Sequence, residues 1–171
     1  AARAVQLADA GLQEAVGPRL RGKLGFAYAQ GAPLELREIA LEGRDYALTG
    51  SARIDGIQGQ VDAIVTPDLV LRADRLARFG PLAGLDLRGA AQLAITGQVQ
   101  PVSGKLDLTL EGGTRDLGTG IARLDPLLAG EGEMKLKLRR DERALLAEGL
   151  RIATEHATIE GSARLATGAG T

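Results

Sequence analysis

The sequence of 171 residues lacks cysteine altogether, and its aromatic residues are limited to two tyrosines and two phenylalanines. Without cysteine, disulfides, thiol catalysis and cysteine metal ligands are excluded. Aromatic side chains anchor most sugar sites, nucleic-acid platforms and protein hot spots, and they make up only 2% of this chain. The apolar residues are mainly Leu, Ile, Val and Ala, so we expect the buried surface to be smooth and aliphatic.

An excess of either charge is also absent. The chain carries 21 basic and 22 acidic residues, interspersed along its length, for a formal charge of −1. This balance does not indicate nucleic acid or another polyanion as a partner. No run approaches the roughly 18 apolar residues that span a bilayer, so we predict no transmembrane span in these residues. The chain begins Ala1-Ala2-Arg3 with no signal-like segment, and we interpret it as a fragment whose anchor or export signal lies elsewhere.

The signatures of common catalytic and cofactor sites are missing as well. The one histidine, His156, falls on the polar parity of its run, and we expect it to be solvated. None of the three serines lies in a Gly-x-Ser-x-Gly elbow, and acidic residues alternate with basic ones instead of clustering at metal-ligand spacing. Two Gly-x-Gly pairs, beginning at Gly118 and Gly130, are interpreted as turns, because neither completes a dinucleotide fingerprint. We therefore predict that the protein is not an enzyme and uses no cofactor or metal.

Most of the chain alternates apolar and polar residues with a period of two, which is typical of strands with one buried face and one face in water. Because parallel strands buried on both faces show continuous apolar runs, strict alternation predicts an antiparallel sheet. The clearest runs are Tyr46–Asp55, Leu106–Glu111, Met134–Arg139 and Ala157–Leu165. Turns are predicted at Gln30–Pro33, Asp55-Gly56, Pro67-Asp68, Pro101–Gly104 and Arg140–Glu142.

One segment, Asp141 to Leu150, permits two interpretations. Its good helix formers follow a residue that can cap a helix, but we favour a strand. The reason is that its counterpart in the repeat described next follows Gly31 and Pro33, where a helix is disfavoured. The charged residues around Asp141 are interpreted as a solvated hairpin tip, with a docking contact for another protein as the alternative.

A repeat is visible in the stretches that break the alternation. Helical spacing occurs in Val5–Val16, Ala73–Phe79 and Ile121–Leu128, and each stretch is followed by a glycine, at Gly17, Gly84 or Gly130. Pro81-Leu82-Ala83-Gly84 recurs as Pro126-Leu127-Leu128-Ala129-Gly130, and Gly50-Ser51-Ala52-Arg53 recurs as Gly161-Ser162-Ala163-Arg164. We predict three copies of a short helix followed by strands, spanning 1–66, 73–113 and 117–171. The first and third copies differ in length by two residues, which we place at the hairpin around Gln30–Pro33.

The run from Leu117 to Gly130, leading into Met134–Leu138, together with the alternating strands, resembles the repetitive body of TamB-type proteins of the AsmA-like superfamily. The resemblance covers essentially the whole chain and contains no catalytic signature. It implies a parent protein anchored in the inner membrane of a Gram-negative bacterium, which crosses the periplasm and meets a TamA-like outer-membrane barrel protein. It also implies a role in outer-membrane protein assembly and in phospholipid transport between the membranes.

We therefore predict an all-β fold with a few short helices, in which an elongated antiparallel sheet curves into an open apolar groove. A closed sandwich or barrel is the alternative. Small residues on the apolar parity, such as Gly50, Ala52, Gly161 and Ala163, would underfill a closed core and favour the groove. The residues predicted to line the groove are Leu48, Ile54, Leu106, Leu108, Leu110, Met134, Leu136, Leu138, Ile159 and Leu165.

The function predicted from these features is a non-enzymatic bridge segment that offers its groove to phospholipid acyl chains. An aliphatic surface gives a lipid tail about 0.8 kcal/mol per buried CH2, and head groups can stay in water at the rim. The alternative is a scaffold or chaperone that pairs its sheet edge with strands of outer-membrane barrels. A plain structural spacer is the third possibility.

Overall fold

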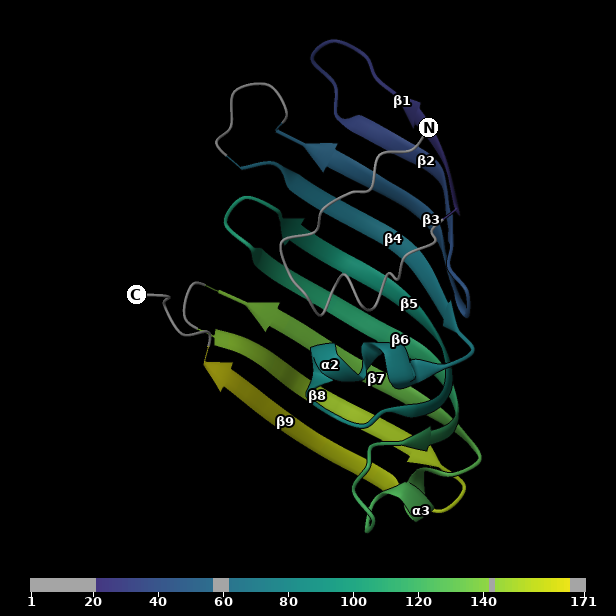
Figure 1. Cartoon of the computed structure of the whole chain (residues 1–171). Coiled ribbons are helices and arrows are strands. Elements are labelled where there is room, and N and C mark those ends of the chain that lie inside the picture. Colours follow the sequence, from purple (N-terminus) through teal and green to yellow (C-terminus); the bar gives the residue numbers. More distant parts are fainter. Residues whose placement is uncertain (1–20, 57–61, 142–143, 167–171) are drawn as a thin grey trace.

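The computed structural model describes residues 21–56, 62–141 and 144–166. They form one antiparallel sheet of nine strands, which lie side by side in chain order (Figure 1). The strands are β1 (Arg21–Ala27), β2 (Leu34–Glu42), β3 (Tyr46–Asp55), β4 (Ile64–Ala73), β5 (Arg88–Gln100), β6 (Lys105–Gly118), β7 (Glu131–Arg140), β8 (Ala144–Thr154) and β9 (Thr158–Ala166). Within the described residues β1 and β9 each pair with one strand only, so the sheet is not closed into a barrel. The predicted all-β, curved antiparallel sheet is confirmed.

The sheet has two chemically different faces because apolar residues of one strand pair with apolar residues of the next, and polar residues pair with polar ones. Leu108 lies opposite Leu138, and Leu110 lies opposite Leu136, where β6 meets β7. One position further along, Thr109 lies opposite Lys137 on the other face. Since successive side chains of a strand point to opposite sides, the same parity carries the apolar residues across the sheet. We call the two sides the apolar face and the outer face.

The predicted turn at Pro67-Asp68 is wrong. Both residues lie inside β4, where Pro67 pairs with Ala52 of β3 and is buried. The ladder from β4 to β5 pairs Val65 with Val99 and next pairs Asp68 with Thr96, without the intervening pairs. Proline has no N–H to donate to a ladder, and the gap lies where that donor is missing. The strand therefore continues past a residue that usually ends one.

From Ala144 onward the ambiguous segment is a strand, as we favoured. Asp141 does not cap a helix; its side-chain Oδ1 accepts a hydrogen bond of 2.9 Å from the backbone N–H of Ala144. The Asp141 N–H in turn donates to the Ala144 carbonyl, which closes the hairpin between β7 and β8. The same polar side chain that can start a helix here stabilises a turn.

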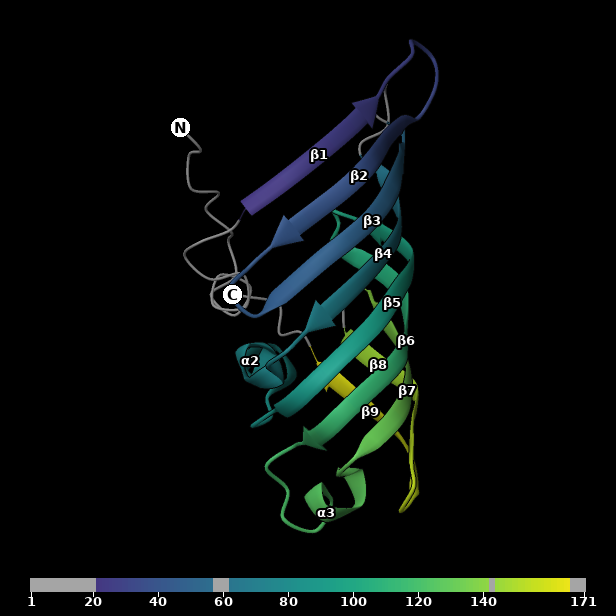
Figure 2. The ribbon, with the colours of Figure 1, turned by 90° about the vertical axis from the view of Figure 1, so that its right-hand side faces the viewer.

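Short helices lie at one end of the strands, which we call the helix end. The 3-10 helix η1 (Leu76–Phe79) and α2 (Gly80–Ala83) join β4 to β5, and α3 (Asp125–Leu128) joins β6 to β7. Gly84 ends α2 in the left-handed conformation, with φ of 65°. Figure 2 shows α2 on the inner side of the curved sheet. Two of the three predicted helices are thus present, and Val5–Val16 lies outside the described residues.

The ladders that join β1, β2 and β3 are irregular at positions that correspond to the irregularities in the ladders joining β7, β8 and β9. The β1–β2 ladder shifts between Lys23 and Gly25, and the β7–β8 ladder shifts between Lys135 and Lys137. The β2–β3 ladder shifts between Leu36 and Ile39, and the β8–β9 ladder shifts between Ala147 and Leu150. Equivalent residues are 112 apart in β1 and β7 (135 − 23) but 111 apart in β3 and β9 (161 − 50). The hairpin between β1 and β2 therefore accounts for one of the two residues by which the first copy was predicted to be longer than the third. The repeat boundaries stay a prediction.

Leu128 of α3 provides a test of how the helices hold the sheet. It is 2% exposed and packs with Leu117 and Ile152, whereas the adjacent Leu127 is 39% exposed. We expect Leu128→Ala to lower the free energy of unfolding by about 2–5 kcal/mol, because it leaves a cavity in a cluster that cannot fully collapse. Leu127→Ala is the matched control and should change it by less than about 1 kcal/mol. Chemical denaturation measures both, and equal losses would contradict this packing.

The hydrogen bonds of the Asp125 carboxylate lead us to predict that stability depends on pH. Its carboxylate accepts hydrogen bonds from the Thr119 N–H at 2.7 Å and the Thr119 hydroxyl at 2.9 Å, and the first of these is the main reason its pKa is lowered from 3.8. A carboxyl with a lowered pKa in the folded state stabilises the fold above its ordinary pKa and loses this contribution as the pH falls through the folded value. Asp125→Asn should therefore be less stable than wild type at pH 7, and the difference should shrink below pH 3.8. Denaturation curves across this range measure the difference.

Candidate functional site

Apolar residues occupy one face of the sheet from β2 to β9, and Arg140 of β7, which pairs with Leu106, is a charged residue in the row nearest the hairpin between β7 and β8. Directly opposed residues form rows that cross the sheet. One complete row from β2 to β9 contains Leu41, Leu48, Leu71, Leu93, Gly112, Met134, Ile152 and Ile159. Leu76 of η1 and Leu128 of α3 pack with Leu93 and Ile152 of this face. Figure 2 shows α2, which directly follows η1, on the inner side of the curved sheet, so the apolar face is the inner one. The result is an aliphatic trough that crosses the strands.

The register places all ten residues predicted for the groove on this one face. Leu48, Met134 and Ile159 belong to the row just described. A second row, nearer the hairpins that join β5 to β6 and β7 to β8, contains Ile54, Leu106 and Leu165. Between these rows lie the pairs Leu110–Leu136 and Leu108–Leu138. Residues as far apart in the chain as Leu48 and Ile159 thus contribute to one surface, because each consecutive pair of strands keeps its parity.

The helices divide this face into a covered part and an open part. At the helix end, Leu76 of η1 and Leu128 of α3 join a buried cluster with Leu93, which is 5% exposed, and Ile152, which is 6% exposed. Three predicted groove residues pack against that cluster, namely Leu110, Met134 and Ile159. Leu48 also lies outside the cluster, in the row that contains Leu93, and five half-buried residues lie nearer the opposite end of the strands: Ile54, Leu106, Leu108, Leu136 and Leu138. We call these five residues the open trough.

An aromatic contact strengthens the covered end. The rings of Tyr46 on β3 and Phe79 on η1 meet edge to face, with centroids 6.2 Å apart. The guanidinium of Arg78 lies 4.9 Å from the Tyr46 ring centroid and forms an ion pair with Asp45. Partial burial raises the pKa of Tyr46 above its usual value, and the nearby Arg78 opposes that shift. Two of the four aromatic residues in the chain therefore fix η1 to the sheet, and they do not line the open trough.

Small residues hollow the floor beside the open trough. Gly97 of β5 lies opposite Leu108 and has a φ of 130°, a conformation that L side chains rarely adopt. A Cβ at this position would collide with the backbone carbonyl oxygen of Asp107 on β6. Glycine is therefore required for the close approach of the two strands.

Several apolar-face residues were missed by the sequence analysis. Residues 91–99 of β5 show a period of two that could have been found, and they contribute Leu93 and Ile95. In β2 the pattern is hidden by a bulge, since Leu36 and Ile39 have different parity yet lie on the same face. Glu38 in this bulge has a φ of 53°. One extra residue in a strand shifts every later side chain to the opposite face, so the alternation no longer reveals the strand.

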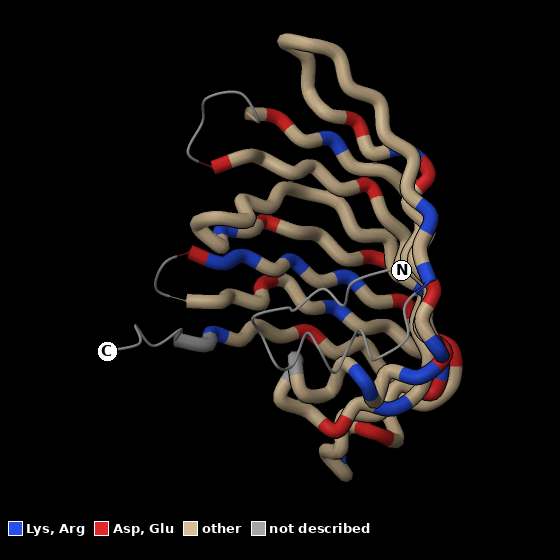
Figure 3. Tube along the Cα trace, turned by 45° about the horizontal axis from the view of Figure 1, so that its top comes forward, with Lys and Arg blue, Asp and Glu red and all other residues tan. Residues whose placement is uncertain are grey.

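Charged residues of both signs are interspersed along the strands (Figure 3), and the ion pairs described next join residues of the outer face. Lys137 Nζ lies 3.4 Å from Asp107, Arg139 lies 3.5 Å from the same carboxylate, and Arg151 lies 3.0 Å from Glu160. All of these side chains are half exposed or more, and pairs of this kind contribute little to stability. Their effect is to keep this face in water, which leaves the apolar face as the surface for burial.

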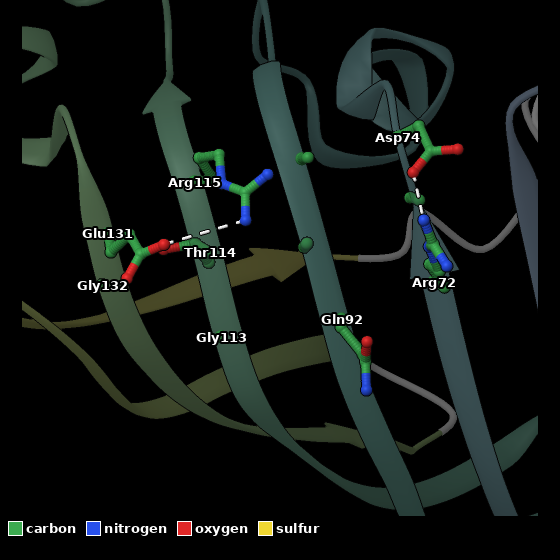
Figure 4. A pocket seen from close by; sticks show the side chains of 11 residues that line it. Arg72, Asp74, Gln92, Gly113, Thr114, Arg115, Glu131 and Gly132 are labelled. Carbon is green, nitrogen blue, oxygen red and sulfur yellow. Dashed lines mark ion pairs between the residues drawn. The ribbon is translucent and has the colours of Figure 1, made fainter.

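A hollow of about 350 Å³ on the outer face is the other feature that we considered as a site (Figure 4). Its cations each face an anion: Arg72 lies 3.4 Å from Asp74, and Arg115 lies 3.7 Å from Glu131. The hollow exists because Ala90 and Gly113 on its floor carry little or no side chain. With both arginines paired, the hollow presents no net charge to an anionic ligand, and it is the weaker candidate.

No family model, curated protein or solved structure matches this chain. In the part of the chain that the structure describes, no helix is both long and apolar enough to cross a membrane. The same residues contain no group of three or more His, Cys, Asp or Glu side chains arranged to hold a metal ion. His156 is exposed, as expected, and its backbone N–H donates to the Thr154 hydroxyl at 3.2 Å. The functional assignment therefore rests on the geometry of the trough.

A charge in the open trough should abolish binding of apolar probes. We expect Leu108→Asp to reduce binding of a fluorescent apolar dye by about tenfold or more, because the carboxylate would have to lose water beside Leu138. Thr109→Asp is the matched control, since it places the same charge one position along, on the outer face and opposite Lys137. Dye titration measures binding, and circular dichroism checks folding. Equal binding by the two variants would show that the dye binds elsewhere.

Proposed function

We propose that this chain is a periplasmic segment of a TamB-type bridge protein and that its open trough holds phospholipid acyl chains in transit between the inner and outer membranes. The observation that carries this proposal is the apolar face itself, which extends from β2 to β9 and is only partly buried at Ile54, Leu106, Leu108, Leu136 and Leu138. A contiguous apolar surface that is not fully covered marks a binding surface. The segment carries out no reaction, and its role is to lower the free energy of a lipid tail outside a bilayer.

The chemistry of the trough suits an acyl chain better than a polar ligand. Its side chains offer burial and dispersion, worth about 25 cal/mol per Å² of apolar area, and no hydrogen bonds. A tail gains about 0.8 kcal/mol for each CH2 that it buries, whatever its position along the trough. A ligand bound in this way can slide, because no directional bond must break when it moves. A head group is left in water at the rim of the sheet.

The openness of the sheet separates this proposal from a closed core. A sandwich would cover the apolar face with a second sheet. In the described residues, the elements packed on this face are η1 and α3, at the helix end only, and α2 contacts η1. The proposal further places the parent protein at the inner membrane of a Gram-negative bacterium, with a TamA-like outer-membrane barrel protein as its partner and outer-membrane protein assembly as an associated process.

Photo-crosslinking in cells tests the lipid assignment. A diazirine amino acid at Leu108 or Leu136 in the parent protein should give phospholipid adducts on irradiation, detected by mass spectrometry. The same amino acid at Lys137 is the control, because Lys137 follows Leu136 directly and faces the outer side. Adducts at the leucines and not at Lys137 are the expected result. Adducts to protein alone, or none despite efficient labelling, would overturn the lipid proposal.

A second candidate function is a scaffold for the strands of outer-membrane proteins. The observation that favours it is that the sheet ends, within the described residues, in two strands with a free side, β1 and β9. A free edge presents a row of backbone donors and acceptors to which an extended segment can add. This function and lipid transport use different parts of the molecule, the edge and the face, and one chain can serve both.

A further inference from the structure

Arg140 is the one charged residue in an otherwise aliphatic row of the apolar face. The row crosses the sheet from β2 to β9 through directly opposed residues, at the end of the strands opposite the helix end, which we call the hairpin end. Its members are Leu34, Ile54, Val65, Val99, Leu106, Arg140, Leu145 and Leu165. The cation departs from the pattern that places charges on the outer face.

Arg140 also differs from the nearest cations of β7 in having no ion pair. Lys137 and Arg139, on the outer face, lie 3.4 Å and 3.5 Å from the carboxylate of Asp107. Among the described residues no acidic side chain pairs with Arg140, which is exposed. Its positive charge is therefore not neutralised within the part of the chain that the structure describes.

The guanidinium of Arg140 lies beside the hairpin that joins β5 to β6. A Cβ built on Gly104 in that hairpin would lie 3.9 Å from Arg140 Cζ. Across the ladders Arg140 lies opposite Leu106 on β6 and Leu145 on β8. The apolar stem of an arginine can lie on such leucines while its charged head stays in water. The charge therefore lies where the open trough meets solvent.

The open trough has the length of a lipid tail when it is measured along β7 from Arg140. Leu138, Leu136 and Met134 follow on the apolar face at intervals of two residues. A strand rises about 3.4 Å per residue, so the step of six residues (140 − 134) spans about 20 Å. The tails of one bilayer leaflet occupy about 15 Å, half of a hydrocarbon core of about 30 Å. A tail that starts at Arg140 ends near Met134, which packs against the buried cluster.

We propose that Arg140 binds the phosphate of a phospholipid whose acyl chain lies in the open trough. This inference rests on the proposed function and adds the position of the head group, at the hairpin end, and the direction of the tail, towards the helix end. A guanidinium matches phosphate geometry, because its planar fork donates two parallel N–H···O bonds to two oxygens of one group. The ligand is thus a lipid with a phosphodiester in its head group.

Arg140 gives a weak fixed point to a lipid that otherwise slides. An ion pair at an exposed site contributes little free energy and is screened by salt, so it does not trap the ligand. Its main effect is on orientation. It favours a head group in water at the hairpin end over the reverse orientation, in which the head group would lie against the buried cluster at the helix end.

The test compares two lipids that carry the same short fluorescent acyl chains, using the full chain of 171 residues. Phosphatidylglycerol has one phosphodiester, and diacylglycerol has none. In fluorescence titrations we expect wild type to bind phosphatidylglycerol about fivefold more tightly than diacylglycerol. Arg140→Gln should weaken binding of phosphatidylglycerol by about fivefold and leave binding of diacylglycerol unchanged. Arg140→Lys should keep part of the preference, because an ammonium binds phosphate as a point charge.

Arg139→Gln is the matched control. It removes the same charge from the adjacent residue, which faces the outer side and pairs with Asp107. This variant should bind both lipids like wild type. Both arginines are exposed, so chemical denaturation should give the wild-type unfolding midpoint for Arg140→Gln and Arg139→Gln.

Equal affinity of the wild-type chain for the two lipids would overturn this inference alone and leave the proposed function standing. Equal losses in Arg140→Gln and Arg139→Gln would assign the preference to overall charge and not to Arg140. If inorganic phosphate binds as tightly as phosphatidylglycerol, Arg140 is a plain anion site and the assignment to a lipid is wrong. If neither lipid binds, the proposed function fails and this inference fails with it.

Discussion

The antiparallel hydrogen-bond ladder is the constraint on which the rest of this structure depends. Each strand pairs with the next along its length, so the parity of one strand is passed to its neighbour and, in turn, across nine strands. Ile54 on β3 and Leu138 on β7 share a face only because every intermediate pair keeps this relation. Where the ladder shifts, at Leu36–Ile39 and Ala147–Leu150, one extra residue changes the sequence parity of the strand, and the apolar residues on both sides of the bulge stay on the same face.

A one-sided sheet of this kind must either cover its apolar face or use it. The chain covers the helix end with η1, α2 and α3, where Leu93 and Ile152 are buried, and this cluster supplies the tertiary packing that a single sheet otherwise lacks. It leaves the open trough half-exposed, and this arrangement costs free energy in water unless a ligand is present. The division places stability and binding in different parts of one surface, so a ligand can enter without disturbing the buried cluster.

The edge strand β9 closely resembles the interior strand β3. A strand that lies at the boundary of the described sheet has the register, the bulge and the glycine of an interior strand. An added strand would lengthen the trough, because the ladder carries the parity across it. A surface built by repetition can be extended at its edge without change to its interior, as in other repeat architectures.

Much of this architecture follows from the sequence alone. Local alternation is enough to predict the strands β3, β6, β7 and β9, the charged outer face and a common face for all ten groove residues, because the period of two is a property of any extended chain. The repeat, and not the local pattern, separated strand from helix after Asp141, because the counterpart segment follows Gly31 and Pro33. The local pattern failed at Pro67, because proline can lie inside a strand when the ladder omits the pair that needs its N–H. It also failed in β2, where the bulge at Glu38 hides the alternation.

Only the tertiary structure decided which half of the apolar face is covered, and it alone identified the edge strands. Both depend on contacts between distant segments, such as Leu128 with Ile152 and Gly50 with β4, and the local order of residues does not contain these contacts.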